Sequence, residues 1–134
     1  MMTNQNSKGK SQNYNSKFKS DIKTRCYHFT LNIISLTDKL PNRRSLVIIS
    51  NQLVKSATSI GANLVEARAS SSRLEFKKFY EIALKSANET KYWLCLLRDG
   101  KFVAPDIINV LLNETAEIAN MLASGVLKLK SKKF

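Results

Sequence analysis

Apolar residues recur at alternating spacings of three and four over four long stretches of the chain, and this period constrains the fold more than any other feature. In the first stretch the row is Ile22, Cys26, Phe29, Ile33, Leu36 and Leu40. Such spacing places the side chains on one face of an α-helix. Similar rows follow in the other three stretches, and no segment competes as a β-strand. The sequence therefore predicts an all-α protein.

Turn and capping residues divide this period into four helices. We expect them at about residues 18–40, 43–69, 73–98 and 105–130. Pro41 ends the first helix, and Ser72 with Glu75 forms a capping box at the start of the third. Gly100 is the expected left-handed residue after the third helix. Short connections between long helices predict an antiparallel up-down-up-down four-helix bundle over residues 17–130.

The second expected helix carries a wider apolar arc than a single neighbour requires. Its main row consists of Leu46, Ile49, Leu53, Ala57, Ile60, Leu64 and Ala67. A second row, about a third of a turn away, consists of Val47, Val54, Gly61 and Val65. We expect this helix to contact two partners, either within the fold or across a subunit contact.

The charge of the chain is strongly positive and concentrates near its ends. Lys and Arg number 22 against 10 Asp and Glu, which gives a net charge of +12. Residues 1–20 and 128–134 hold four lysines each and no acid, so +4 remains for the rest. The Asn, Ser, Gln and Lys composition of residues 1–16 predicts a disordered basic arm, and residues 131–134 form a basic tail. This surplus favours a polyanionic partner, usually nucleic acid.

Several functional classes find no support in the residues. His28 is the only histidine, and no phosphate-binding, hydrolase or paired-cysteine motif occurs. We therefore expect no enzymatic activity, no metal site and no cofactor. Cys26 and Cys95 are expected to be reduced, a single bridge being the alternative. Without an apolar h-region or membrane span, we expect a cytoplasmic protein without membrane contact.

Five polar residues follow one face of the second expected helix. They are Gln52, Ser56, Ser59, Asn63 and Glu66, at spacings of four and three. A buried amide or carboxylate needs a hydrogen-bond partner, and the third helix offers candidates in Asn88 and Glu89, or in Lys85 and Lys91. We favour a structural polar network or a subunit interface over a direct ligand site. The simpler alternative is that this face of the helix is exposed to solvent.

Basic residues outside the arm supply the candidates for nucleic-acid contact. They are Arg43, Arg44, Arg68, Arg73, Lys77, Lys78, Lys128, Lys130, Lys132 and Lys133. We expect the connection between the second and third helices to lie at the opposite end of the rod from the last residues of the fourth. Basic patches at both ends would become rings in a cyclic oligomer. Nothing in this pattern indicates base-specific readout.

The segments "QLVKSATSIGANLVEA" and "EFKKFYEIALKSANETKYWLCLL" resemble the 23S rRNA intervening-sequence proteins of bacteria. The resemblance covers about residues 22–130 and implies a four-helix bundle that assembles as a homopentamer. Some relatives are accessory proteins of diversity-generating retroelements, in which a basic barrel engages the reverse transcriptase and nucleic acid. The family-pattern positions here are Gln52, Ser56, Ser59, Asn63, Glu66 and Glu89, none of them catalytic. The opening "SKFKSDIKTRCYHF" and the basic arm depart from the family pattern.

These observations lead to one functional hypothesis and one alternative. The first is a non-enzymatic oligomeric bundle that binds RNA or DNA through charge, or acts beside a nucleic-acid-processing protein. The alternative is a protein-interaction or scaffold module that does not bind nucleic acid.

Overall fold

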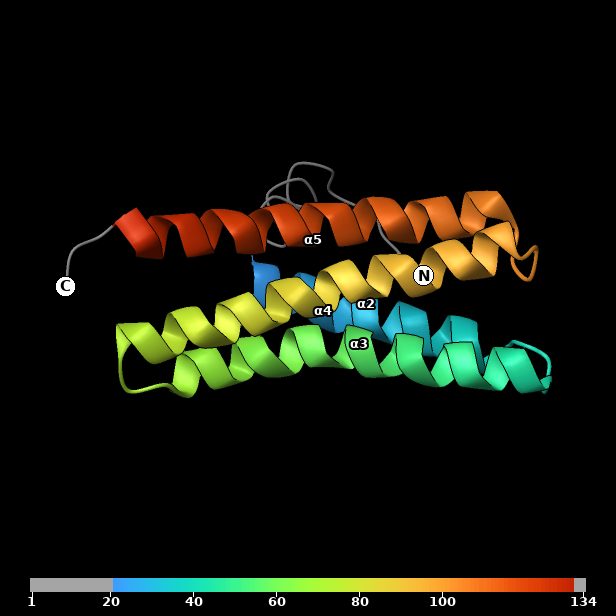
Figure 1. Cartoon of the computed structure of the whole chain (residues 1–134), viewed down its shortest axis with the longest axis horizontal. Helices are drawn as coiled ribbons and strands as arrows, with labels where there is room; N and C mark the ends of the chain where they lie inside the picture. The colour runs from blue at the N-terminus through green and yellow to red at the C-terminus, as the bar shows by residue number, and fades with distance from the viewer. Residues whose placement is uncertain (1–20, 132–134) are drawn as a thin grey trace, which may run out of the picture.

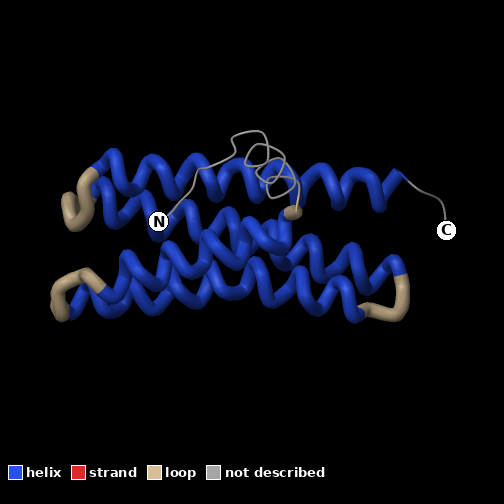
Figure 2. Tube along the Cα trace, turned by 180° about the vertical axis from the view of Figure 1, so that it is seen from behind, coloured by secondary structure: helices blue, strands red, loops and turns tan. Residues whose placement is uncertain are grey.

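The computed structural model describes residues 21–131, and in that part the chain forms four α-helices and no strand. The helices are α2 (Ile22–Asp38), α3 (Arg44–Ala69), α4 (Arg73–Asp99) and α5 (Pro105–Ser131). They lie side by side as an elongated bundle with short connections at its ends (Figures 1 and 2). The predicted four-helix bundle is confirmed, whereas the predicted arm of residues 1–16 lies outside the described residues.

The four helices pack in chain order around one core. Contacts join α2 to α3, α3 to α4, α4 to α5 and α5 back to α2. Within the described residues, the diagonal pairs α2–α4 and α3–α5 make no comparable backbone contact. The helix α2 is the shortest, and it passes behind α4 and α3 in Figure 1. Consecutive helices run in opposite directions, as expected.

The direction of the helices corrects our expectation about the ends of the bundle. Leu129, near the end of α5, lines the same cavity as Ala67 and Arg73 beside the α3–α4 connection. At the far end, the guanidinium of Arg43 lies 5.5 Å from the centre of the Phe102 ring. The α3–α4 connection and the end of α5 therefore share one end (Figure 1). The expectation was wrong because, in an alternating bundle, the second and fourth helices run in the same direction.

The first helix begins at Ile22 rather than at residue 18. Asp21 has extended backbone angles, and its carboxylate accepts hydrogen bonds from the backbone N–H groups of Lys23 and Thr24. The Thr24 hydroxyl donates to the same carboxylate over 2.6 Å. These bonds, the one from this hydroxyl foremost, lower the pKa of Asp21. An aspartate that satisfies the first N–H groups in this way ends the helix at its N-terminal side.

The expected capping box is present at the start of α4. The backbone N–H of Glu75 donates to Ser72 Oγ over 3.1 Å. The Glu75 carboxylate accepts in return from the N–H of Ser71 over 3.0 Å, one residue earlier than in the standard arrangement. The boundary between α3 and α4 is therefore fixed by side chains that the sequence already identifies.

The core is built from the predicted rows of all four helices. Its largest fully buried apolar side chains are Phe29, Ile33, Leu46, Leu53, Ile60, Leu94, Leu97, Ile108, Ile118 and Leu122. Cys26 is also buried, and a Cβ at Gly61 would contact it at 3.8 Å, so α2 lies close to α3 there. Burial raises the pKa of the Cys26 thiol to about 12. Both cysteines are free, and no bridge joins them.

The turn after α4 differs from the expected one by one residue. Gly100 has φ −77°, and the left-handed residue is Lys101, with φ 63°. Gly100 is needed for space instead. A Cβ there would lie 2.7 Å from Phe102 Cε2 and 2.9 Å from the carbonyl oxygen of Leu96. The turn therefore holds the Phe102 ring directly against the end of α4.

Replacing Gly100 by alanine should destabilise the fold by roughly 1–3 kcal/mol, because the backbone oxygen of Leu96 cannot easily move away from the added methyl group. Urea unfolding measures the change. Lys101→Gly is the matched control. Glycine adopts the left-handed conformation without strain, but it also raises the conformational entropy of the unfolded chain. Because these two effects oppose each other, the free energy of unfolding of this variant should stay within about 1 kcal/mol of the wild type. Equal stability of Gly100→Ala and the wild type would contradict this packing argument.

Candidate nucleic-acid interface and its supporting polar contacts

The polar face of α3 meets α4 through a row of hydroxyl groups. Thr90 on α4 donates to Ser56 Oγ over 2.9 Å, and both side chains are buried. Ser86 on α4 donates to Ser59 Oγ over 2.8 Å. Asn63 Nδ2 donates to the Ser59 carbonyl and hydroxyl oxygens over 2.8 and 3.0 Å. Three of the five predicted polar positions therefore form a network between α3 and α4.

The partners within this network differ from those we expected. Glu89 instead accepts a hydrogen bond from the indole N–H of Trp93 on its own helix, at 3.0 Å. Glu66 is exposed, and Gln52 is half-buried at the edge of the network. The observed partners, Ser86 and Thr90, are buried residues on the face of α4 that points into the core. Two hydroxyl residues four apart in an otherwise apolar row were the signal that could have identified them.

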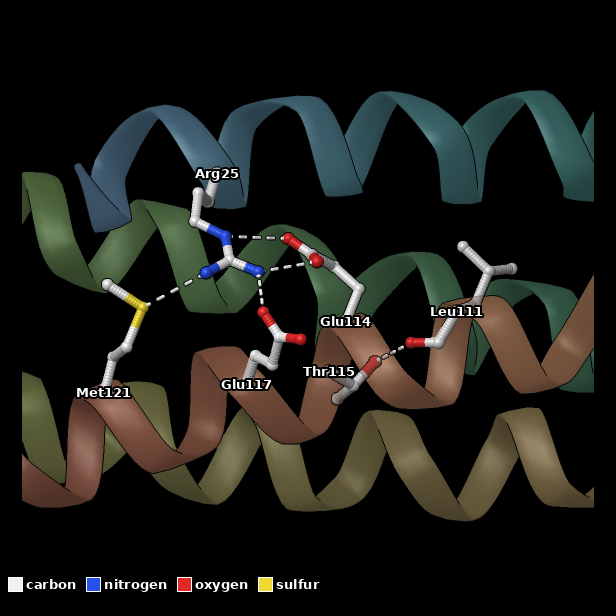
Figure 3. Close-up of polar contacts among 6 residues, drawn as sticks. All are labelled: Arg25, Leu111, Glu114, Thr115, Glu117 and Met121. Atoms are coloured by element: carbon white, nitrogen blue, oxygen red, sulfur yellow. Dashed lines mark hydrogen bonds and ion pairs between the residues drawn. The ribbon is translucent and has the colours of Figure 1, made fainter. Parts of the chain in front are cut away.

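A second polar cluster joins α2 to α5, and the sequence analysis missed it. The Arg25 guanidinium donates to both oxygens of Glu114, at 3.0 and 2.7 Å (Figure 3). The same guanidinium reaches Glu117 at 2.5 Å and the sulfur of Met121 at 3.6 Å. The Arg25 side chain is only 14% exposed. Pairing with Glu114 raises the pKa of Arg25 above its ordinary value.

The Arg25 cluster borders a groove of about 480 Å³ between α2 and α5. Its apolar lining includes Phe29, Val110 and Leu111, and its polar lining includes His28 and Asn32. The two carboxylates at this groove are already bound to one guanidinium. Among residues 21–131, no group of three or more His, Cys, Asp and Glu residues could hold a metal ion. The groove thus has an apolar floor, and beside it lies an ion cluster of one guanidinium and two carboxylates.

The predicted basic residues divide unequally between the two ends of the bundle. Those beside the α3–α4 connection and the last turns of α5 are Arg68, Arg73, Lys77, Lys78 and Lys128, here called the basic end. Lys130 belongs to the last turn of α5, whereas Lys132 and Lys133 lie outside the described residues. Arg43 and Arg44 lie at the opposite end, where α3 begins. Most candidates therefore converge instead of forming two matched patches.

Close packing of α4 and α5 brings the cations of the basic end together. Lys77 is half-buried and lies 3.9 Å from Glu81, whereas Lys78 and Lys128 are exposed. At the same end of the bundle, Tyr80 stacks on Phe76 with ring centres 5.0 Å apart. A Cβ at Gly125 of α5 would lie 2.6 Å from the Tyr80 ring. The absence of a side chain at residue 125 therefore allows α5 to approach α4 at this end.

Fold and charge together define a basic four-helix bundle protein. A family model described as 23S rRNA-intervening sequence protein matches residues 19–124. The chain belongs to that family, and the resemblance noted in the sequence is confirmed.

A solved structure supports the same assignment. It is a crystal structure of a protein with unknown function from the S23 ribosomal protein family of Bacteroides thetaiotaomicron. The two chains are 36% identical, with a TM-score of 0.74 over 78% of this chain and 97% of that chain. No curated protein matches the chain. No helix among the described residues is long and apolar enough to cross a membrane.

The buried hydroxyl pair between α3 and α4 gives a stability prediction. Thr90→Val and Ser56→Ala should each destabilise the protein by about 1 kcal/mol, because each removes the hydrogen bond between the two helices and leaves the other hydroxyl only its bond to a carbonyl oxygen of its own helix. The double variant should lose about 0.5–1 kcal/mol less than the sum. Urea unfolding of all four proteins measures this coupling. Thr58→Val is the matched control, since Thr58 is exposed; strict additivity would contradict the pairing.

The Arg25 cluster gives a second prediction. Arg25→Leu should destabilise the protein by about 1–3 kcal/mol, because Glu114 and Glu117 would remain close together without their cation. Arg25→Lys keeps the charge but loses the forked geometry, so its loss should be smaller. Glu117→Gln is the control with the smallest expected effect, since the Glu117 side chain is 63% exposed. Thermal and urea unfolding would refute the argument if Arg25→Leu matched the wild type.

Proposed function

We propose that this protein is a non-enzymatic, oligomeric nucleic-acid-binding bundle whose basic end contacts the phosphate backbone. The observation that carries the proposal is the convergence of five cations from α3, α4 and α5 at one end. A compact group of Arg and Lys attracts a polyanion far more strongly than the same charges spread over the surface. Family membership supports the proposal, since the family is named for intervening sequences of 23S rRNA.

The mode of binding follows from the residues at the basic end. Arg and Lys side chains contact phosphate oxygens without reading the base sequence. The aromatic rings at this end, Phe76 and Tyr80, stack on each other and are half-buried, so they do not offer a free face for base stacking. We therefore expect weak sequence preference and steep salt dependence.

The proposal includes a cyclic homo-oligomer, which the family resemblance implies to be a pentamer. If the ring axis follows the long axis of the bundles, the basic ends of all copies face one side of the ring. This arrangement would give one strongly basic rim rather than two. A rim of this kind would bind a longer polyanion with several copies at once.

The role as an accessory to a nucleic-acid-processing protein is compatible with this proposal. The competing scaffold function, without nucleic-acid binding, is favoured by the lysines outside the described residues, because such tails raise solubility by themselves. Removing residues 1–16 and 132–134 separates the two ideas. If the shortened bundle loses all affinity for RNA, the basic end is not the contact surface.

Titration of a fluorescent single-stranded RNA at 50 and 200 mM salt tests the proposal. With about six phosphate contacts on a single strand, affinity should fall roughly 300-fold between the two concentrations. Arg73→Ala together with Lys78→Ala should weaken binding to every sequence and reduce the steepness of log affinity against log salt by about 1.4.

Arg43→Ala together with Arg44→Ala is the matched control at the opposite end, and it should change the affinity much less. Melting temperatures confirm that each variant remains folded. Salt-insensitive binding, or no binding at 50 mM salt, would refute the proposed function. An equal loss in both double variants would refute the assignment to the basic end.

A further inference from the structure

The outer side of α4 carries a row of exposed residues that begins at the basic end. The row consists of Lys78, Lys85 and Tyr92, which follow each other at intervals of seven residues and are here called the α4 row. Seven residues are almost two helical turns, so the three side chains project from one side of the helix about 10 Å apart. Because Lys78 belongs to the basic end, the α4 row continues that surface along the bundle for about 20 Å.

Tyr92 is an exposed aromatic residue held against a fixed neighbour. It is 58% exposed, whereas Trp93 is half-buried and packs against the core. The two rings meet edge to face, with centres 4.9 Å apart and an angle of 74° between their planes. The hydrogen bond from the Trp93 indole N–H to Glu89 restrains the indole ring. Since an edge-to-face contact covers at most one face of either ring, Tyr92 keeps ring surface for a further contact.

The two lysines of the α4 row are open to an anion. Neither Lys78 nor Lys85 forms an ion pair with any residue between 21 and 131. Two acids share this side of α4, and each already has a partner. Glu81 lies 3.9 Å from the amine of Lys77, and Glu89 accepts the indole hydrogen bond. The lysines between the basic end and Tyr92 therefore remain available to phosphate groups.

Cations that lead to an exposed aromatic ring match the chemistry of a single-stranded nucleic acid. Proteins bind single strands through cations that follow the backbone and through aromatic side chains on which bases stack. A duplex offers the same phosphates, but its bases are stacked on each other and cannot reach a side chain such as Tyr92. Within the basic end, Phe76 and Tyr80 stack on each other and are half-buried. Tyr92 thus supplies the stacking surface that the basic end lacks.

We infer that a nucleic-acid single strand runs from the basic end along the α4 row and stacks one base on Tyr92. This inference rests on the proposed function and narrows its ligand to unpaired nucleic acid. The lysines bind the backbone between the basic end and the stacked base. Every base has a π-face, so contact with Tyr92 strengthens binding without selecting a sequence.

The fluorescence of Trp93 gives a direct readout of this contact. Trp93 is the only tryptophan of the chain, and its ring touches that of Tyr92. An unstructured single-stranded RNA, added at 50 mM salt, should therefore change the tryptophan emission as it binds. The same strand annealed to its complement should bind through its phosphates and leave the emission unchanged.

Variants of the α4 row separate stacking from charge. Tyr92→Ala should weaken single-strand binding roughly 5- to 100-fold and leave both duplex affinity and the salt dependence unchanged. Tyr92→Phe keeps the ring and should bind as the wild type does. Lys85→Gln should reduce the steepness of log affinity against log salt by about 0.7 and preserve the emission change at saturation. Tyr27→Ala is the matched control, because Tyr27 is 65% exposed on α2, the helix diagonal to α4, and its loss should not alter affinity.

Two results would overturn the inference while the proposed function stands. One is salt-dependent RNA binding with no change in tryptophan emission. The other is equal single-strand affinity of Tyr92→Ala and the wild type. The absence of any RNA binding at 50 mM salt is a different outcome, because it refutes the proposed function together with this inference. All these variants change exposed residues, and circular dichroism melting checks that each remains folded.

Discussion

The packing of α3 against α4 is the constraint on which the rest of the structure depends. These are two of the three long helices, and each buries its apolar row against the other while hydroxyl groups from both are paired between them. Apolar rows alone tolerate sliding by a turn, because one leucine replaces another at similar free energy. The hydrogen bond between Ser56 and Thr90 can form in one register only, so it favours that register by about 1 kcal/mol, although each hydroxyl also binds a carbonyl oxygen of its own helix. That register sets which loops and which cations meet at each end.

The short helix α2 completes the core in a different way. Its buried residues Cys26, Phe29 and Ile33 cover the apolar rows of its neighbours, and Gly61 allows it to lie close to α3. On its other side an ion cluster takes the place of dense apolar packing, since Arg25 binds two carboxylates of α5 beside an open groove. The α2–α5 contact thus depends on electrostatics as well as on apolar burial.

Much of the fold could be predicted from the sequence because the residues that define each helix and its ends lie close together along the chain. The period of apolar residues identifies the helices, and Ser72 with Glu75 marks a boundary through groups three residues apart. Asp21 could have been recognised in the same way as the residue that begins α2. The left-handed turn was misplaced by one residue, since the need for Gly100 comes from Phe102 and from the Leu96 carbonyl, which only the folded turn brings together.

The polar contacts were harder to predict from the sequence because they join residues that are far apart along the chain. Arg25 and Glu114 are 89 residues apart, and no spacing rule relates them. For the α3 polar face the sequence supplied the donors and acceptors of one helix, but we expected Asn88 and Glu89, or Lys85 and Lys91, as their partners on α4. To assign the basic residues to the two ends of the bundle, only the direction of each helix is needed. We placed the α3–α4 connection and the end of α5 at opposite ends, and this placement was wrong.

Gly125 has a consequence for the electrostatic potential of the molecule. With no side chain there, α5 lies against the Tyr80 ring, and Lys128 is held at the same end of the bundle as Lys77 and Lys78 at the beginning of α4. The local concentration of positive charge is thus a property of helix packing as well as of composition. A homologue with the same number of lysines and a larger residue at this position would spread them over a wider area. Its potential at the bundle end would be lower.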